Sequence, residues 1–202
     1  MKSKLFYSSE YQRIETEIRK LINRQSDFLN ETTSSSTRAT GDAIQQILSN
    51  NFQSLLGATC SEYSTDFARR AMADLAFKDN DGIYYVVDVK THRKEIGFHM
   101  PNLTSVERLA RFYEDDMNCF AILSVSYSIK GNKVTAENIH FVPIEFLSWK
   151  CLTIGALGWG QIQIANSDRI DVIEKYPRKK WMLELCDRLF QFYPREIEKI
   201  AE

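Results

Sequence analysis

The chain has 202 residues, of which 44% are hydrophobic and 26% are charged, with a formal net charge of −1. These values are typical of one folded domain with a buried core, and no apolar run approaches the ~20 residues that a membrane span requires. A near-neutral charge argues against a protein that coats nucleic acid without specificity, although it permits a local basic cleft. The four cysteines form no disulfide or zinc pattern and no secretory signal is visible, so we expect a cytoplasmic protein that does not bind membranes.

Apolar periodicity and turn composition divide the first half of the chain into helices followed by strands. The helices are expected over about 8–30 and 41–56, with a polar loop over 31–39 between them. Strands are expected near 58–64, 71–78 and 82–90, the last two joined by a turn.

The second half of the chain predicts a β-hairpin between two helical segments. The expected elements are a loop over 92–102, a helix over about 104–116, paired strands over 119–129 and 134–141, a short helix over 145–150, a loop over 151–158, a strand over 159–165, and a helix over about 178–200 that breaks or kinks at Pro194. Helices that flank one mixed sheet predict a single α/β domain over 1–202.

Two carboxylates and a lysine stand near the ends of the second and third strands. Side chains alternate along a strand, so Asp88 and Lys90 share one face, Val89 takes the other, and a hairpin can bring Asp74 to the first face. Two hard oxygen ligands and an ammonium in a small volume suit Mg²⁺ and a phosphodiester. The alternative is a salt bridge at a strand end with Asp74 as a turn acid, and these residues alone leave both interpretations open.

The pattern resembles the PD-(D/E)xK nuclease superfamily, and within it the type II restriction endonucleases of the EcoRV and HincII kind. The likeness rests on Asp-Val-Lys-Thr at 88–91, on Pro101-Asn102, on Gln161-Ile162-Gln163, and on similar spacing from about Thr40 onward. Ala73 stands where the superfamily name has Pro, which is not a ligand. The resemblance implies a restriction endonuclease-like fold in a prokaryotic cytoplasm, and Mg²⁺-dependent hydrolysis of double-stranded DNA at a short palindromic site, leaving blunt ends.

The resemblance also implies a role for each residue of this group. Asp74, Asp88 and the backbone carbonyl of Val89 would bind the metal, and Lys90 would act beside the attacking water or the phosphate. A further acid could come from the second helix, where Asp42 is the candidate and Gln45 lies one turn along. The alternative is that Asp42 only stabilises the start of that helix.

Three segments are candidates for contacting the duplex. Arg38 belongs to a Ser/Thr-rich loop that could equally be a linker, and Arg93 and Asn102 belong to the loop after the motif. In the third segment, glycines allow close backbone approach and a glutamine can read an adenine, although a tight core turn is the competing interpretation. Its candidate residues are Gly155, Ala156, Gly158, Trp159, Gln161 and Gln163.

A protein that cuts both strands of a palindrome is most simply a twofold homodimer. The helix over 8–30 could form that interface or could cap the sheet. Two other functions stay open: a repair or structure-specific nuclease with the same fold, and a non-catalytic DNA-binding module.

Overall fold

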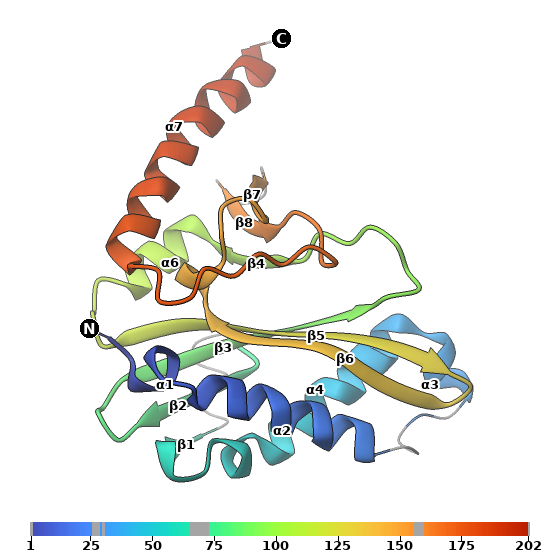
Figure 1. Ribbon diagram of the computed structural model, residues 1–202. Helices are drawn as coiled ribbons and strands as arrows, with labels where there is room; N and C mark the ends of the chain where they lie inside the picture. Colours follow the sequence, from blue (N-terminus) through green and yellow to red (C-terminus); the bar gives the residue numbers. More distant parts are fainter. Residues whose placement is uncertain (1, 26–28, 30, 65–72, 156–159, 202) are drawn as a thin grey trace. The chain divides into compact units, whose positions relative to one another are not determined.

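The computed structural model describes residues 2–25, 29, 31–64, 73–155 and 160–201 (Figure 1). The chain forms two compact units. Unit 1 comprises Met1–Gly97 with Asp115–Pro143, and unit 2 comprises Phe98–Glu114 with Ile144–Glu202. The predicted mixed α/β class, with helices packed against a central mixed sheet, is confirmed. The single-domain assignment stays a prediction.

Unit 1 is built on a five-stranded sheet with the order β1-β2-β3-β5-β6. Only β3 and β5 run parallel, and the other neighbours are antiparallel. The predicted strands and both hairpins are present, with ends that differ by a few residues. The strands are β1 (Cys60–Tyr63), β2 (Leu75–Asp79), β3 (Tyr84–Arg93), β5 (Asn118–Lys130) and β6 (Lys133–Pro143).

The helices of unit 1 depart from the prediction at their starts. The polar stretch expected as a loop contains α3 and the beginning of α4, because the Ser36 hydroxyl accepts a hydrogen bond from the Ala39 N–H and caps a helix there. The helix predicted over about 8–30 is present as α2 and ends at Arg24, and a short helix that was not predicted, α1, precedes it. The helices are α1 (Lys4–Tyr7), α2 (Glu10–Arg24), α3 (Glu31–Ser35) and α4 (Thr37–Leu56), followed by the 3₁₀ turn η1 (Gly57–Thr59).

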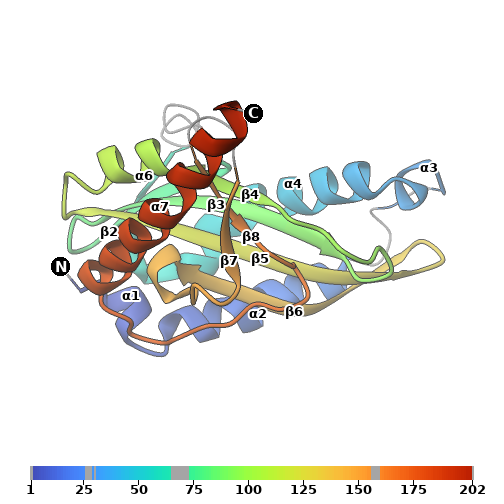
Figure 2. The ribbon, with the colours of Figure 1, turned by 90° about the horizontal axis from the view of Figure 1, so that it is seen from above.

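Helix α2 lies along β6 and covers this edge of the sheet (Figure 2). The Asn23 side chain accepts a hydrogen bond from the Ala136 N–H and donates one to the Ala136 carbonyl. The Glu15 carboxylate accepts from the Phe141 N–H. These contacts satisfy outward-facing groups of an edge strand, which would otherwise be open to pairing with another chain. The geometry therefore favours α2 as a cap of the sheet.

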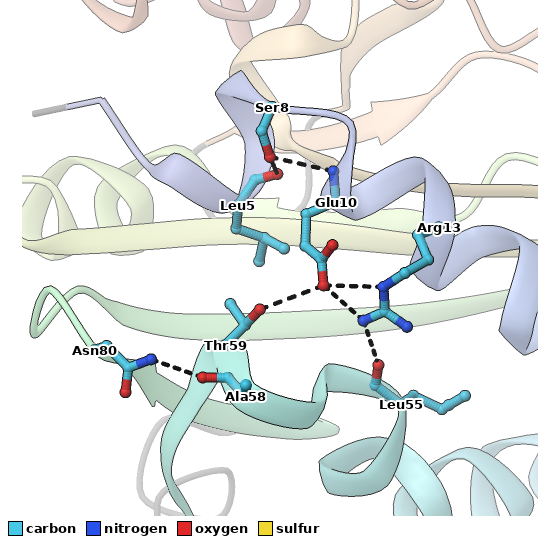
Figure 3. Close-up of polar contacts among 8 residues, drawn as sticks. All are labelled: Leu5, Ser8, Glu10, Arg13, Leu55, Ala58, Thr59 and Asn80. Carbon is cyan, nitrogen blue, oxygen red and sulfur yellow. Dashed lines mark hydrogen bonds and ion pairs between the residues drawn. The ribbon is translucent and has the colours of Figure 1, made fainter.

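A polar cluster joins the start of α2 to the end of α4 (Figure 3). The Glu10 carboxylate accepts hydrogen bonds from the Arg13 guanidinium and from the Thr59 hydroxyl, and Arg13 also donates to the Leu55 carbonyl. The hydrogen bond from Arg13 lowers the pKa of Glu10. Because Leu55 lies in the last turn of α4, Arg13 satisfies a carbonyl that has no partner within the helix.

The stability of unit 1 should fall in mild acid because of His140. Burial, reinforced by the charge of Arg19, lowers the pKa of the His140 imidazole from its ordinary 6.5. The unfolded chain therefore takes up a proton that the folded chain resists, so stability is constant above this ordinary value and declines as the pH falls below it. We expect the urea midpoint of His140→Gln to fall less than that of the wild type between neutral and mildly acidic pH. Equal declines would contradict this prediction.

Unit 2 holds a three-stranded antiparallel sheet with the order β4-β8-β7. Strand β7 lies where a loop was expected, and β4 runs from the end of an expected loop into the start of the helix predicted over about 104–116, because four residues are too short for an alternating pattern to stand out. The predicted helix over 145–150 is a 3₁₀ turn. The elements are β4 (Asn102–Ser105), α6 (Val106–Phe112), η2 (Ile144–Phe146), β7 (Leu152–Gly155), β8 (Gln161–Ile164) and α7 (Arg178–Ala201).

Helix α7 is anchored at its first turn and continues through Pro194, so the helix is not broken there, and the alternative of a kink at Pro194 stays a prediction. The Glu145 carboxylate, which is buried, accepts from Arg178 Nε at 3.0 Å and from the Tyr113 hydroxyl at 2.9 Å. The rings of Trp149 and Trp181 stack with their centroids 4.8 Å apart.

None of the helices among the described residues has the length and apolar character that a membrane span needs.

Candidate active site

The hairpin of β2 and β3 owes its register to a buried carboxylate in the turn. Asp79 Oδ1 accepts hydrogen bonds from the N–H groups of Asp81 and Ile83, and the Tyr85 hydroxyl donates to Asp79 Oδ2 at 2.7 Å. The last residue pair of the ladder, at the end away from the turn, is Leu75 with Val87. These contacts fix which residues of the two strands face each other.

One step beyond that pair, the register brings Asp74 opposite Asp88. Asp74 is exposed, and its Oδ2 accepts a hydrogen bond from the Val89 N–H at 2.7 Å. Lys90 Nζ lies 2.9 Å from Asp88 Oδ1, and the two side chains are 26% and 15% exposed. The structure therefore places Asp74, Asp88 and Lys90 at the same end of the β2–β3 ladder, with Lys90 and Asp88 only partly open to solvent, and their joint role in one site stays a prediction.

Helix α4 closes the other side of this strand end. A Cβ atom on Gly41 would lie 2.6 Å from Thr91 Oγ1, so the helix backbone approaches β3 more closely than any other residue type would allow. One turn further along α4, Gln45 Nε2 donates a hydrogen bond to the Val89 carbonyl at 3.3 Å. Val89 lies beyond the last residue pair between β2 and β3, and side chains take the place of strand pairing there. The Val89 N–H donates to Asp74, and the Val89 carbonyl accepts from Gln45.

The oxygen atoms gathered here suit a hard cation. Two carboxylates and a backbone carbonyl are ligands that Mg²⁺ takes, with water completing its octahedron. Asp88 Oδ2 is buried, as is expected of an oxygen directed into a site. Within the described residues, no group of three or more His, Cys, Asp or Glu could hold a metal. A cation at this position would therefore depend on Asp74, Asp88, the Val89 carbonyl and water.

The other predicted residues of unit 1 have different surroundings. Asp42 is exposed and lies in the second turn of α4, so the interpretation of it as a first-turn acid is wrong, because the helix begins at Thr37. Arg38 is exposed in the first turn of α4. The Arg93 guanidinium donates to the Ser34 carbonyl at 3.0 Å and to Glu95 at 3.2 Å. These contacts tie Arg93 to the α3 segment. They also occupy hydrogen-bond donors of the Arg93 guanidinium that could otherwise bind a phosphate.

In unit 2 the structure joins residues that lie far apart in the sequence. Gln163 Nε2 donates a hydrogen bond to Asn102 Oδ1 across the β4–β8 pair. Gly155 makes room for this glutamine, since a Cβ at 155 would lie 2.5 Å from Gln163 Oε1. Gln161, two residues before Gln163 on β8, faces Gly155 in the strand pairing. Ala156, Gly158 and Trp159 lie outside the described residues.

The sequence analysis missed a hollow of about 310 Å³ between α7 and β7. Trp149, Leu152 and Phe192 supply apolar walls, and its charged residues are mostly basic. The cations are Arg188, Arg195 and Lys199, and the acid is Glu196, which pairs with Lys199 at 2.5 Å. The cationic residues recur on one side of the helix after seven and four positions, which is the signal that could have revealed this basic surface.

Gly41→Ala should weaken the packing of α4 against β3. Thr91 is β-branched and stiff, so an added methyl must displace the helix, at a cost of about 1–3 kcal/mol, against about 0.5–1 kcal/mol gained from alanine in a helix. Thr91→Ala removes the opposing hydroxyl, and we expect the double variant to recover the lost stability. Urea unfolding of the single and double variants measures the coupling. A single Gly41→Ala variant as stable as the wild type would contradict the close approach.

No protein-family model matches this chain, and no curated protein matches it. Its function must therefore be argued from its own residues and geometry.

Proposed function

We propose that this protein is a Mg²⁺-dependent endonuclease that hydrolyses phosphodiester bonds of double-stranded DNA at a short palindromic site, as type II restriction endonucleases do, and leaves blunt ends. The observation that carries the proposal is the group formed by Asp74, Asp88, Val89 and Lys90 at the end of the β2–β3 ladder. A salt bridge at a strand end requires only Asp88 and Lys90. Here a second acid, Asp74, lies at the same strand end, and the Gln45 side chain of α4 donates a hydrogen bond to the Val89 carbonyl.

The residues of the group divide the work of phosphodiester hydrolysis. Mg²⁺ supplies charge neutralisation on the phosphate and lowers the pKa of an attacking water. Asp74 and Asp88 would hold the ion together with the Val89 carbonyl. The Lys90 ammonium, held by Asp88, would lie beside the water or a phosphate oxygen and stabilise negative charge there. Gln45, through its hydrogen bond to the Val89 carbonyl, would keep that oxygen in position, and Asp42 stays a candidate auxiliary acid.

Duplex recognition would fall to residues outside this group. We propose Asn102, Gln161 and Gln163 of unit 2 as base-contacting residues, since amide side chains can bond adenine through two hydrogen bonds. Gly155, Ala156, Gly158 and Trp159 belong to the same segment. Arg38 and Arg93 are the proposed phosphate contacts in unit 1. Twofold cutting would be performed by a homodimer with one such site in each copy, in a prokaryotic cytoplasm.

The test is incubation of the purified protein with phage DNA and Mg²⁺, beside the Asp88→Asn variant. Discrete bands that the variant does not produce would support site-specific cleavage, and sequencing of the ends would give the target and the cut position. A smear that the variant does not produce would favour a repair or structure-specific nuclease. DNA binding without cutting in Mg²⁺, across several genomes, would favour the non-catalytic module and refute the enzyme proposal.

A further inference from the structure

The side of α7 that packs within unit 2 changes its chemistry halfway along the helix. Alternating spacings of four and three residues place six residues on this side: Trp181, Leu185, Arg188, Phe192, Arg195 and Lys199. The first two are fully or nearly fully buried, and Trp181 stacks on Trp149. A helix side that served only for packing would stay apolar along its length. Here three of the last four positions are cationic, which indicates a role other than packing.

These four residues line the hollow between α7 and β7, whose volume of about 310 Å³ lies at the lower end of the range for small-molecule sites. Trp149, which ends the packed part of the helix side, forms an apolar wall together with Leu152 and Phe192. Gln191 and Thr153 add polar groups to the lining. Apolar walls with a few polar and charged groups are the usual form of a ligand site.

The charges of the hollow indicate the kind of ligand. Lys199 pairs with Glu196, the one acid of the lining. Among the residues that the structure describes, the side chains of Arg188 and Arg195 form no ion pair or hydrogen bond. They lie seven residues apart, about 10 Å along the helix, and both reach the same hollow. Two guanidinium groups beside one hollow favour a ligand with more than one negative charge.

We propose that this hollow binds a phosphate monoester with a flat aromatic body, of which a nucleoside monophosphate is the ordinary biological example. The phosphate group, which carries nearly two negative charges at neutral pH, would accept hydrogen bonds from Arg188 and Arg195, because the guanidinium fork matches phosphate oxygens. The aromatic body would pack against the Phe192 ring and Leu152. The site uses none of the residues proposed for DNA cleavage, so failure of either proposal leaves the other standing.

The first experiment is calorimetric titration of the full chain with AMP at low salt, in EDTA so that no divalent metal contributes. We expect a Kd of about 10–100 µM, which a ligand of about twenty non-hydrogen atoms reaches at ordinary ligand efficiency. Adenosine, which lacks the phosphate, and orthophosphate, which lacks the aromatic body, should each bind at least tenfold more weakly. Absence of AMP binding, or equal binding of either fragment, would overturn the proposal.

Variants of α7 assign the binding to the hollow. Arg188→Gln and Arg195→Gln should each weaken AMP binding about tenfold, because each removes charge-assisted hydrogen bonds. The matched control is Lys179→Gln, which alters an exposed cation of the same helix outside the hollow and should bind AMP as the wild type does. Phe192→Ala should weaken AMP binding several-fold and leave orthophosphate binding unchanged. Circular dichroism checks that each variant is folded, and unchanged AMP binding by both arginine variants would refute the site.

A competition experiment separates a small ligand from a polynucleotide backbone, which also presents phosphates to cations. AMP is titrated into the wild type with and without an excess of a short DNA duplex, again in EDTA. We expect the same Kd for AMP in both titrations, because the hollow would hold one small ligand and not the duplex. Loss of AMP binding in the presence of the duplex would show that DNA occupies the hollow. The two cations would then be backbone contacts, and the proposal of a small-molecule site would be wrong.

Discussion

Asp88→Asn should lower Mg²⁺-dependent DNA cleavage by about 10³-fold or more, while the protein stays folded. The amide retains the size of the carboxylate but loses the charge that holds the metal and Lys90, and metal-based stabilisation of the transition state amounts to several kcal/mol. Asp74→Asn and Lys90→Ala should reduce cleavage to a similar degree. Single-turnover cleavage of a defined duplex, with thermal unfolding measured in parallel, separates lost chemistry from lost structure.

The matched control is Asp81→Asn, which changes an exposed aspartate of the same hairpin that pairs with Lys4. Its cleavage should equal that of the wild type, since Asp81 lies at the opposite end of the hairpin from Asp74. With Ca²⁺ in place of Mg²⁺, the wild type should bind DNA without cutting it. Cleavage by Asp88→Asn at the rate of the wild type, or rapid cutting in Ca²⁺, would refute the assigned roles.

The sequence predicted the carboxylate group because its placement depends on local rules. A turn rich in Asp and Gly specifies a hairpin, and strand alternation then decides which side chains share a face. Asp74, Asp88 and Lys90 needed no more than these two rules to be brought together. The contact of Gln45 with the Val89 carbonyl depends on how α4 packs against β3, and the sequence offered only the single glycine at 41 as a sign of it.

The errors arose where tertiary contacts or very short elements override local preference. Ser36 starts α4 earlier than apolar periodicity indicated, because a cap depends on one side chain rather than on a repeated pattern. Strands β4 and β7 exist as partners of β8, and the hydrogen bond from Gln163 to Asn102 spans 61 residues of sequence. Pro194 leaves α7 continuous, since one lost backbone hydrogen bond in a long helix can be outweighed by the rest of the helix.

Asp79→Ala should destabilise the protein by about 3 kcal/mol or more and should also reduce cleavage. Asp79 is 4% exposed and accepts hydrogen bonds from two backbone N–H groups and from the Tyr85 hydroxyl, so alanine removes several charge-assisted bonds and leaves buried donors unsatisfied.

The same turn sets the register that brings Asp74 opposite Asp88, because a slip of one residue would move every side chain of β2 to the other face. Asp79→Asn, which keeps the acceptor oxygen but loses the charge, should be intermediate between alanine and the wild type in both stability and cleavage. Urea unfolding gives the loss of stability. Cleavage per folded molecule, measured well below the unfolding midpoint, gives the effect on the site. A stable Asp79→Ala variant that cuts normally would show that the hairpin register does not depend on this carboxylate, and the account of how Asp74 and Asp88 are aligned would then be wrong.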